Sequence, residues 1–235
     1  MNITEILNKK IKAKQTVLTE FESKELLKEI GIPIPEQKLT KTKDETVSAA
    51  EKIGYPVVLK LMAEDVVHKS DTGAVKLNIK NKEELGSAFD DLMKIESKSE
   101  KKISVQKMEK EPITELIIGM TTDPQFGPAL MFGIGGILVE LLEDVSFRIA
   151  PITEYDAREQ ISEIKGFPIL DGYRGKPKAD IDAIVETLLK ISDLVVKHEE
   201  IYEMDLNPVF IYDDGLICVD ARIILKNPEN PEHKN

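Results

Sequence analysis

The sequence of 235 residues has a single cysteine, Cys218, so no disulfide can form within the chain. Long apolar runs are also missing. The longest, residues 128–142, contains three glycines and Glu140 and falls short of the roughly 20 apolar residues that span a bilayer. The first 14 residues, MNITEILNKKIKAK, are charged throughout and lack the apolar core of a secretory signal. We therefore expect no membrane segment and a cytoplasmic location.

Basic residues are too few for a nucleic-acid surface. The chain has 32 Lys and Arg residues against 43 Asp and Glu residues, and its formal net charge is −11. A protein that binds nucleic acid broadly needs many phosphate-neutralising side chains on one face. We therefore expect no nucleic-acid partner, and any basic site must be local.

Several common catalytic motifs are absent as well. The sequence contains no G-x-x-x-x-G-K-[ST] phosphate loop, no H-E-x-x-H, no G-x-S-x-G and no Cys/His metal spacing. The glycines at 133, 135 and 136 depart from the dinucleotide-binding pattern because Leu138 takes the place of the third glycine. These absences exclude several hydrolase classes, and the glycine cluster alone is weak evidence for nucleotide binding.

The order of expected elements indicates a mixed α/β chain built from α+β subdomains. Thr19 with Glu22, and Asn81 with Glu84, have the spacing of helix-capping pairs. Residues 74–79 alternate apolar and polar, which predicts a strand with Val75, Leu77 and Ile79 on one side. Residues 1–16 are expected to form a loosely held arm or a short helix. We expect further helices at 44–53, 153–164 and 179–197, and strands at 36–40, 57–62, 103–108, 115–121, 129–132, 201–206, 208–212 and 216–221.

The C-terminal hairpin is the most informative part of the sequence. Asp213-Asp214-Gly215 is a strong turn signal, and a two-residue loop at 213–214 pairs residue 212 with residue 215. Counting outwards from this pair places Asn207 directly opposite Asp220, a position at which Cβ atoms lie about 4.5 to 5.5 Å apart. Strand alternation adds Asp205 and Glu203 to the same side.

This arrangement of oxygen donors favours a metal site. Mg²⁺ takes one or two protein carboxylates and completes its octahedron with water and substrate phosphates, which suits Asn207 and Asp220. The alternative is a solvated acidic edge in which Asn207-Pro208 is simply a turn. The apolar runs 209–211 and 216–219 favour a buried hairpin, where like charges need a cation, so we prefer the metal.

Lys60 and His68 are the other candidate reactive residues. Lys60 lies inside the apolar strand 57–62, where it could contact a phosphate or, as an equally good alternative, extend its ammonium from the strand end into water. His68 lies in a polar loop that ends at Gly73, whose backbone could hold transferred oxygens, and a neutral imidazole is a competent nucleophile toward phosphorus. A histidine in a loop is more often a surface residue.

Several motifs, in order along the chain, resemble those of the ATP-grasp β subunit of ADP-forming acyl-CoA synthetases, a relative of the succinyl-CoA synthetase β chain. The likeness runs from Leu18 to Leu225. The segments that carry it are GYPVVLK at 54–60, VHKSDTG at 67–73, GMTTDPQFGP at 119–128, FGIGG at 132–136, DVSFR at 144–148 and DLNP at 205–208.

The resemblance implies a two-lobed ATP-grasp fold that binds ATP or ADP with Mg²⁺ between two subdomains. One subdomain would comprise residues 17–31 and 109–226 and the other 32–108, with an arm at 1–16 and a tail at 227–235. The residues that would bind the nucleotide or the metal, or take part in the chemistry, are Lys60, Gly73, Gln106, Lys107, Met108, Glu115, Asn207, Asp220, His68 and Asp205.

By the same resemblance, each of these residues has a specific role. Lys60 would contact the phosphates, the backbone of 106–108 would meet adenine, and Glu115 would line the nucleotide pocket. Asn207 and Asp220 would hold Mg²⁺. His68 would be phosphorylated transiently and carry phosphate to ADP, with Asp205 assisting it.

The implied function is that of a nucleotide-binding β subunit, in which acyl-CoA, ADP and phosphate give acid, CoA and ATP. A CoA-binding α subunit would form the acyl phosphate and take the acyl-CoA and CoA, which makes the enzyme a hetero-oligomer. Two alternatives stay open. One is a general ATP-grasp carboxylate ligase for which His68 is dispensable, and the other is a non-catalytic ATP-sensing module that regulates a partner.

Overall fold

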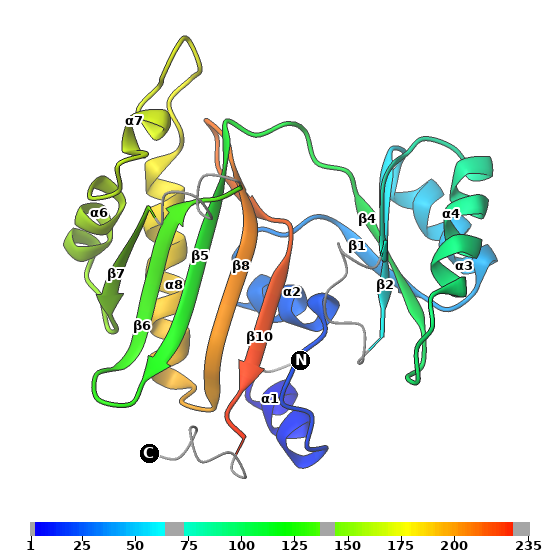
Figure 1. Ribbon diagram of the computed structural model, residues 1–235, viewed down its shortest axis with the longest axis horizontal. Helices are drawn as coiled ribbons and strands as arrows, with labels where there is room; N and C mark the ends of the chain where they lie inside the picture. Colours follow the sequence, from blue (N-terminus) through cyan, green and yellow to red (C-terminus); the bar gives the residue numbers. More distant parts are fainter. Residues whose placement is uncertain (1–2, 64–72, 137–143, 228–235) are drawn as a thin grey trace. The chain divides into compact units, whose positions relative to one another are not determined.

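The computed structural model describes residues 3–63, 73–136 and 144–227 (Figure 1). The chain divides into two compact units, a larger one made of residues 1–34 and 111–235 and a smaller one made of residues 35–110. Each unit has its own hydrophobic core. No helix in the described part of the chain is both long and apolar enough to cross a bilayer.

The smaller unit is a four-stranded antiparallel sheet with two helices. The strand order is β1-β4-β2-β3, and the helices α3 and α4 pack on the sheet (Figure 1). Alternate residues of the central strands, among them Leu59 and Val105, fill the core with apolar residues of the helices. The elements are β1 (Gln37–Thr40), α3 (Lys43–Ile53), β2 (Val57–Met62), β3 (Val75–Ile79), α4 (Lys82–Lys94) and β4 (Lys102–Lys107).

Local capping signals set where the helices begin. The hydroxyl of Thr42 accepts the N–H of Glu45, and the Asn81 side chain accepts the N–H of Glu84 at 2.9 Å. In the larger unit the hydroxyl of Thr19 accepts the N–H of Glu22, whose carboxylate returns to the Thr19 N–H. The helix starts expected at Thr19 and Asn81 are confirmed, because each cap satisfies a backbone donor that has no partner within the helix.

The predicted inner face of β3 is wrong in one position. Leu77 is 62% exposed, whereas Ile79 is buried. The pairing of β3 with β2 shifts between Leu59 and Val57, and Asn78 has a φ of 55°. An irregularity of this kind breaks the two-residue alternation, so Leu77 and Ile79 no longer share a face.

The larger unit is built on a six-stranded antiparallel sheet. Its order is β10-β8-β5-β6-β7, and β9 pairs with β8. Helices α2, α6 and α8 pack against this sheet and supply apolar residues to its core. The strands are β5 (Thr114–Asp123), β6 (Gly127–Ile134), β7 (Val145–Ile149), β8 (Ile201–Ile211), β9 (Leu216–Cys218) and β10 (Ala221–Leu225). The helices are α1 (Ile3–Lys12), α2 (Glu20–Glu29), α6 (Glu154–Ser162), α7 (Phe167–Leu170) and α8 (Ile181–Lys197).

The N-terminal residues form a helix rather than a loose arm. Leu7 of α1 is fully buried in the core of the larger unit. Lys10 also forms an ion pair of 2.6 Å with Glu22 of α2. Of the two alternatives for residues 1–16, the structure has the helix.

Candidate active site

The C-terminal hairpin has the predicted register. Tyr212 donates its N–H to the carbonyl of Gly215 at 2.9 Å, and the pairing continues through Val209 with Cys218 to Leu206 with Ala221. These pairs leave Asn207 opposite Asp220, and the Asn207 N–H donates to the Asp220 carbonyl at 3.2 Å. The predicted pairing of these two residues is confirmed, while their role as metal ligands stays a prediction.

The backbone around Asn207 departs from a regular strand. Where two strands were predicted, β8 is one strand with a β-bulge, because Leu116 pairs with Val209 and Ile118 with Leu206, which leaves an extra residue on β8. On the hairpin's other side, residues 219 and 220 belong to neither β9 nor β10. Bulges often re-aim side chains beside active sites, and here the irregularity falls on both candidate ligands.

The face that carries Asn207 is acidic. Met204 and Leu206 point into the core, so Glu203, Asp205 and Asn207 share the opposite face. Burial raises the pKa of the Asp205 carboxyl, and the negative charges of Asp220 and Glu203 raise it further, against the opposing effect of Arg222. Asp205 therefore lies within the electrostatic field of Asp220.

This donor set fits Mg²⁺. An amide oxygen beside a carboxylate, in a field that already disfavours another negative charge, gives the hard oxygen ligands that this cation prefers. Within residues 3–63, 73–136 and 144–227, no three His, Cys, Asp or Glu side chains gather as a metal site. The candidate is therefore a two-ligand site of Asn207 and Asp220, and phosphate and water would complete its coordination.

Glu115 lies next to the glycine turn at the end of β6. Its carbonyl accepts the N–H of Gly135 at 2.7 Å, and a Cβ atom added at Gly136 would lie 3.7 Å from its Oε2. A Cβ atom at Gly135 would approach the Cβ of Glu115 to 3.2 Å. Small residues here let the turn lie close to Glu115, although a contact of Glu115 with a nucleotide stays a prediction.

Gly133 gives a direct test of this close packing. A methyl group there would lie 2.7 Å from the carbonyl oxygen of Asp144 and 2.9 Å from Cγ1 of Val145. Because backbone must move to accept it, we expect Gly133→Ala to lower the free energy of unfolding by about 1 to 3 kcal/mol, as measured by urea denaturation.

The matched control for Gly133 is Gly86 in α4. A methyl group at Gly86 meets nothing within 4 Å, so Gly86→Ala is expected to stabilise the protein by about 0.5 to 1 kcal/mol through helix propensity. Equal effects of the two substitutions would show that the strand β6 is not closely packed at Gly133.

Lys60 is buried in the smaller unit. It lies at the centre of β2, is 4% exposed, and pairs with Ser104 on one side and Val75 on the other. The ammonium of a side chain buried to this extent does not extend into bulk water, so the alternative of a snorkelling lysine is wrong. Gln106 shares this face of the sheet and donates from Nε2 to the Ser104 hydroxyl at 3.0 Å.

The backbone of 106–108 is already partly engaged. The N–H of Lys107 donates to the Glu36 carbonyl at 2.9 Å, and the N–H of Met108 donates to the Pro56 carbonyl at 3.2 Å. An adenine base that accepts from either N–H would compete with these bonds. These contacts do not test the prediction that the segment meets adenine. They make the N–H groups of Lys107 and Met108 poor candidates for donors to the base, because both already have acceptors.

His68 lies outside the described residues, whereas Gly73, at the end of the same loop, lies inside them. Gly73 has a φ of 68°, a backbone conformation that glycine adopts without steric cost. Its predicted contact with phosphate is not tested.

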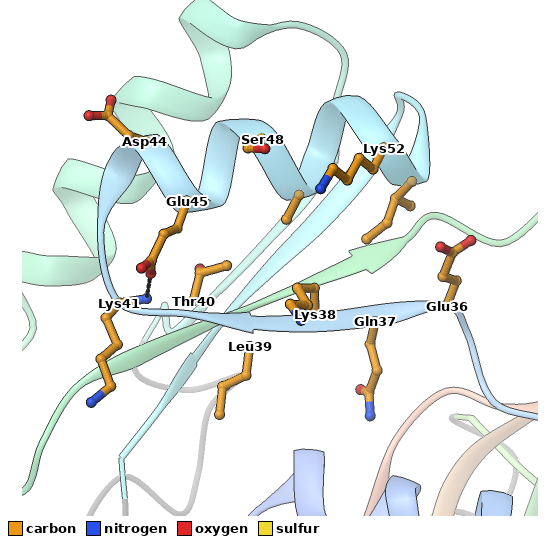
Figure 2. A pocket seen from close by; sticks show the side chains of 12 residues that line it. Glu36, Gln37, Lys38, Leu39, Thr40, Lys41, Asp44, Glu45, Ser48 and Lys52 are labelled. Carbon is orange, nitrogen blue, oxygen red and sulfur yellow. Dashed lines mark hydrogen bonds between the residues drawn. The ribbon is translucent and has the colours of Figure 1, made fainter.

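A separate groove in the smaller unit contains none of the predicted site residues. It has a volume of about 750 Å³ and lies between β1 and α3 (Figure 2). Both acidic and basic side chains line it, including Glu36, Lys38, Lys41, Asp44 and Lys52. This groove is open and charged of both signs, so it does not indicate a nucleotide site.

Asp144 is the first residue of the DVSFR motif at 144–148, and the sequence predicts no role for it. Its two carboxylate oxygens accept the N–H groups of Lys165 and Gly166 at 2.7 and 2.6 Å. The side chain therefore fastens the start of the connector 165–178 to β7. The DVSFR motif was the one sign in the sequence that Asp144 matters. Its two partners could not be predicted, because they lie 21 and 22 residues further along the chain.

The comparisons with known proteins define a class. The model of the ATP-grasp domain matches residues 9–225, so this chain belongs to the ATP-grasp family and has the ATP-grasp fold. It is 52% identical to the β subunit of ADP-forming acetate–CoA ligase II from Pyrococcus furiosus, over 90% of this chain and 93% of that one. Within the ATP-grasp family it belongs with the β subunits of ADP-forming acetate–CoA ligases.

Two further relatives are a longer protein that contains a matching segment and a solved structure with bound ligands. The ADP-forming acetate–CoA ligase I of Archaeoglobus fulgidus is 48% identical over 85% of this chain, which covers 30% of that longer protein. A solved structure of acetyl-coenzyme A synthetase 1 from Ca. Korarchaeum cryptofilum has a TM-score of 0.86 and 42% identity, and covers 95% of this chain and all of that one. It contains coenzyme A and Mg-AMPPCP, with its phosphohistidine segment pointing towards the nucleotide binding site.

Proposed function

We propose that this chain is the nucleotide-binding β subunit of an ADP-forming acyl-CoA synthetase, and that it makes ATP from ADP with phosphate delivered through His68. The observation that carries the proposal is the pairing of Asn207 with Asp220 on an acidic face of the larger unit. The kinship with acetate–CoA ligase β subunits supports the same reaction.

The larger unit would supply the metal ligands. Asn207 and Asp220 would hold Mg²⁺, which neutralises phosphate charge when it is bound. Glu115 would line the nucleotide pocket beside the glycine turn. Because phosphoryl transfer asks the protein mainly for positioning and charge neutralisation, few reactive side chains are needed.

The smaller unit would supply charge and backbone contacts. Lys60 is buried in β2, and we propose that its ammonium contacts the nucleotide phosphates through charge-assisted hydrogen bonds. The segment 106–108 would meet adenine and Gly73 would contact phosphate. The two subdomains of the active protein would be residues 17–31 with 109–226, and 32–108.

The transfer step itself involves His68. A phosphoryl group bonded to a ring nitrogen of His68 would pass to a terminal β-phosphate oxygen of ADP, so the P–N bond breaks as the P–O bond of ATP forms. The electron pair of the broken bond stays on the imidazole nitrogen. Asp205 would hold the ring in position for this step, as the resemblance of the DLNP motif to that of the family implies.

The α subunit is the partner that this proposal requires. The longer relative from Archaeoglobus fulgidus contains a further 70% of chain beyond the part that matches. We propose that a CoA-binding α subunit forms the acyl phosphate and binds acyl-CoA and CoA, in a hetero-oligomer in the cytoplasm. Acyl specificity would then lie in the partner.

Phosphorylation of the isolated chain tests this function. Purified protein incubated with [γ-³²P]ATP and Mg²⁺ should become labelled, and the label should be labile in acid and stable in base, as expected for a phosphohistidine. An unlabelled chain that still activates a carboxylic acid would support the general ligase instead. An unlabelled chain that binds ATP but gives no turnover with an added α chain would support the sensor.

The metal ligands give the next prediction. Asp220→Asn keeps the size of the side chain but removes its charge, so we expect the Mg²⁺ concentration at half-maximal binding of the fluorescent nucleotide mant-ADP to rise about 10- to 100-fold. Asp214→Asn, in the exposed turn of the same hairpin, is the matched control and should leave this midpoint within twofold. If Asp220→Asn also left it unchanged, Asp220 would not be a metal ligand.

A further inference from the structure

A fully buried ion pair lies in helix α2 of the larger unit. The Nζ atom of Lys24 is 3.0 Å from Oε1 of Glu20, and the side chains are 0% and 2% exposed. The two residues lie one helical turn apart, and the helix α2 packs on the strand β10. Burying two charges is costly, and an apolar pair of similar volume is often as stable or more stable. Core packing alone therefore does not account for these residues.

Lys24 also holds a particular peptide group. Its Nζ donates to the carbonyl oxygen of Val219 at 3.2 Å, across 195 positions of sequence. This carbonyl belongs to the peptide that joins Val219 to Asp220, in the short gap between β9 and β10. A contact from α2 thus reaches the backbone immediately before the candidate metal ligand.

Three other backbone groups of this gap bond within the hairpin. Val219 and Asp220 direct their N–H groups to the Pro208 carbonyl at 3.0 and 3.5 Å. The carbonyl of Asp220 accepts the Asn207 N–H and the Cys218 thiol, each at 3.2 Å. The Val219 carbonyl, by contrast, is held by a side chain from another element, that of Lys24 in α2.

We propose that Lys24, oriented by Glu20, is a positioning residue that fixes the Val219–Asp220 peptide and thereby the Asp220 carboxylate. The inference rests on the proposed function, because it assumes that Asp220 binds Mg²⁺. Mg²⁺ demands near-ideal octahedral geometry at about 2.0 to 2.1 Å, so its affinity is sensitive to small displacements of a ligand. A charged donor on the preceding carbonyl restricts rotation of that peptide and limits such displacements.

The test is a double variant, Glu20→Gln with Lys24→Met, in the full-length chain. Removing both charges leaves no unpaired ion in the core, so the protein should fold. The matched control is Glu186→Gln with Lys190→Met. Lys190 likewise pairs with a glutamate one turn away at 2.7 Å and donates to a backbone carbonyl, that of Gly31, at 2.7 Å.

Binding of mant-ADP is measured as Mg²⁺ is titrated. We expect the Mg²⁺ midpoint of the Glu20/Lys24 double variant to rise about tenfold, with binding restored at saturating Mg²⁺. The control double variant should stay within twofold of the wild type. Glu20→Gln alone retains the lysine and an acceptor, and should give an intermediate midpoint.

A second readout needs no metal. In the metal-free protein, the amides of residues 219 to 222 should exchange with deuterium faster in the Glu20/Lys24 double variant than in the wild type. If the Mg²⁺ midpoint stays within twofold while Asp220→Asn raises it, the positioning role is wrong and the metal site stands. If Asp220→Asn leaves the midpoint unchanged, the metal site fails and the role of Lys24 fails with it.

Discussion

His68→Asn should abolish phosphorylation of the chain by [γ-³²P]ATP and reduce ATP synthesis with the α subunit by at least about 10³-fold. Asparagine has no ring nitrogen that can form the P–N bond, so the phosphate cannot be carried. Lys60, Asn207 and Asp220 are unchanged in this variant. Binding of mant-ADP with Mg²⁺ should therefore stay within twofold of the wild type.

The matched control for this experiment is His198→Asn. His198 lies just after α8, and its Nδ1 atom is 3.2 Å from Oε1 of Glu200, a residue for which no role is proposed. This variant should be labelled as fully as the wild type. Equal labelling of the His68→Asn protein would reject the relay, and loss of label in both variants would indicate general loss of structure.

The hairpin shows how much of the site could be predicted from the sequence. A two-residue turn fixes every pair that follows it, so counting from 213–214 was enough to place Asn207 opposite Asp220. The bulge in β8 was not predictable in the same way. It depends on how β8 pairs with β5, a strand about 90 residues away in the sequence.

Long-range contacts explain the other failures. Strands β7 and β10 were not predicted, because each is short and its identity depends on pairing with β6 or β8. Leu77 looked like a core residue because strand alternation is a local rule, and the irregular pairing of β3 overrides it. Helix starts were predicted well, since a cap and its partner lie three residues apart.

Lys24 illustrates a functional inference that the sequence could not provide. In the sequence it is one lysine in a charged helix, EFESKELLKE, and nothing marks it as buried. Its burial and its bond to the Val219 carbonyl follow from the packing of α2 on β10. By contrast, the sequence marks Lys60 as a candidate, because apolar residues precede and follow it in the strand 57–62.

Lys60→Met should separate nucleotide binding from stability. The loss of a charge-assisted contact to phosphate is worth about 1.5 to 3 kcal/mol, so the affinity for ADP should fall about 10- to 100-fold. Phosphoryl transfer at saturating ADP should slow by a further factor of about 10² to 10³, because the charge that develops in transfer loses its stabilising ammonium. Labelling rates and mant-ADP titrations measure the two effects.

Methionine has nearly the length of lysine and is apolar, so it can fill the same space at the centre of β2. We therefore expect the melting temperature of Lys60→Met to stay within about 4 °C of the wild type. The matched control is Lys76→Met in the neighbouring strand β3, a half-exposed residue that pairs with Leu59. This variant should bind and transfer normally. If Lys60→Met did so too, the buried ammonium would serve the sheet alone and some other group would neutralise the phosphates.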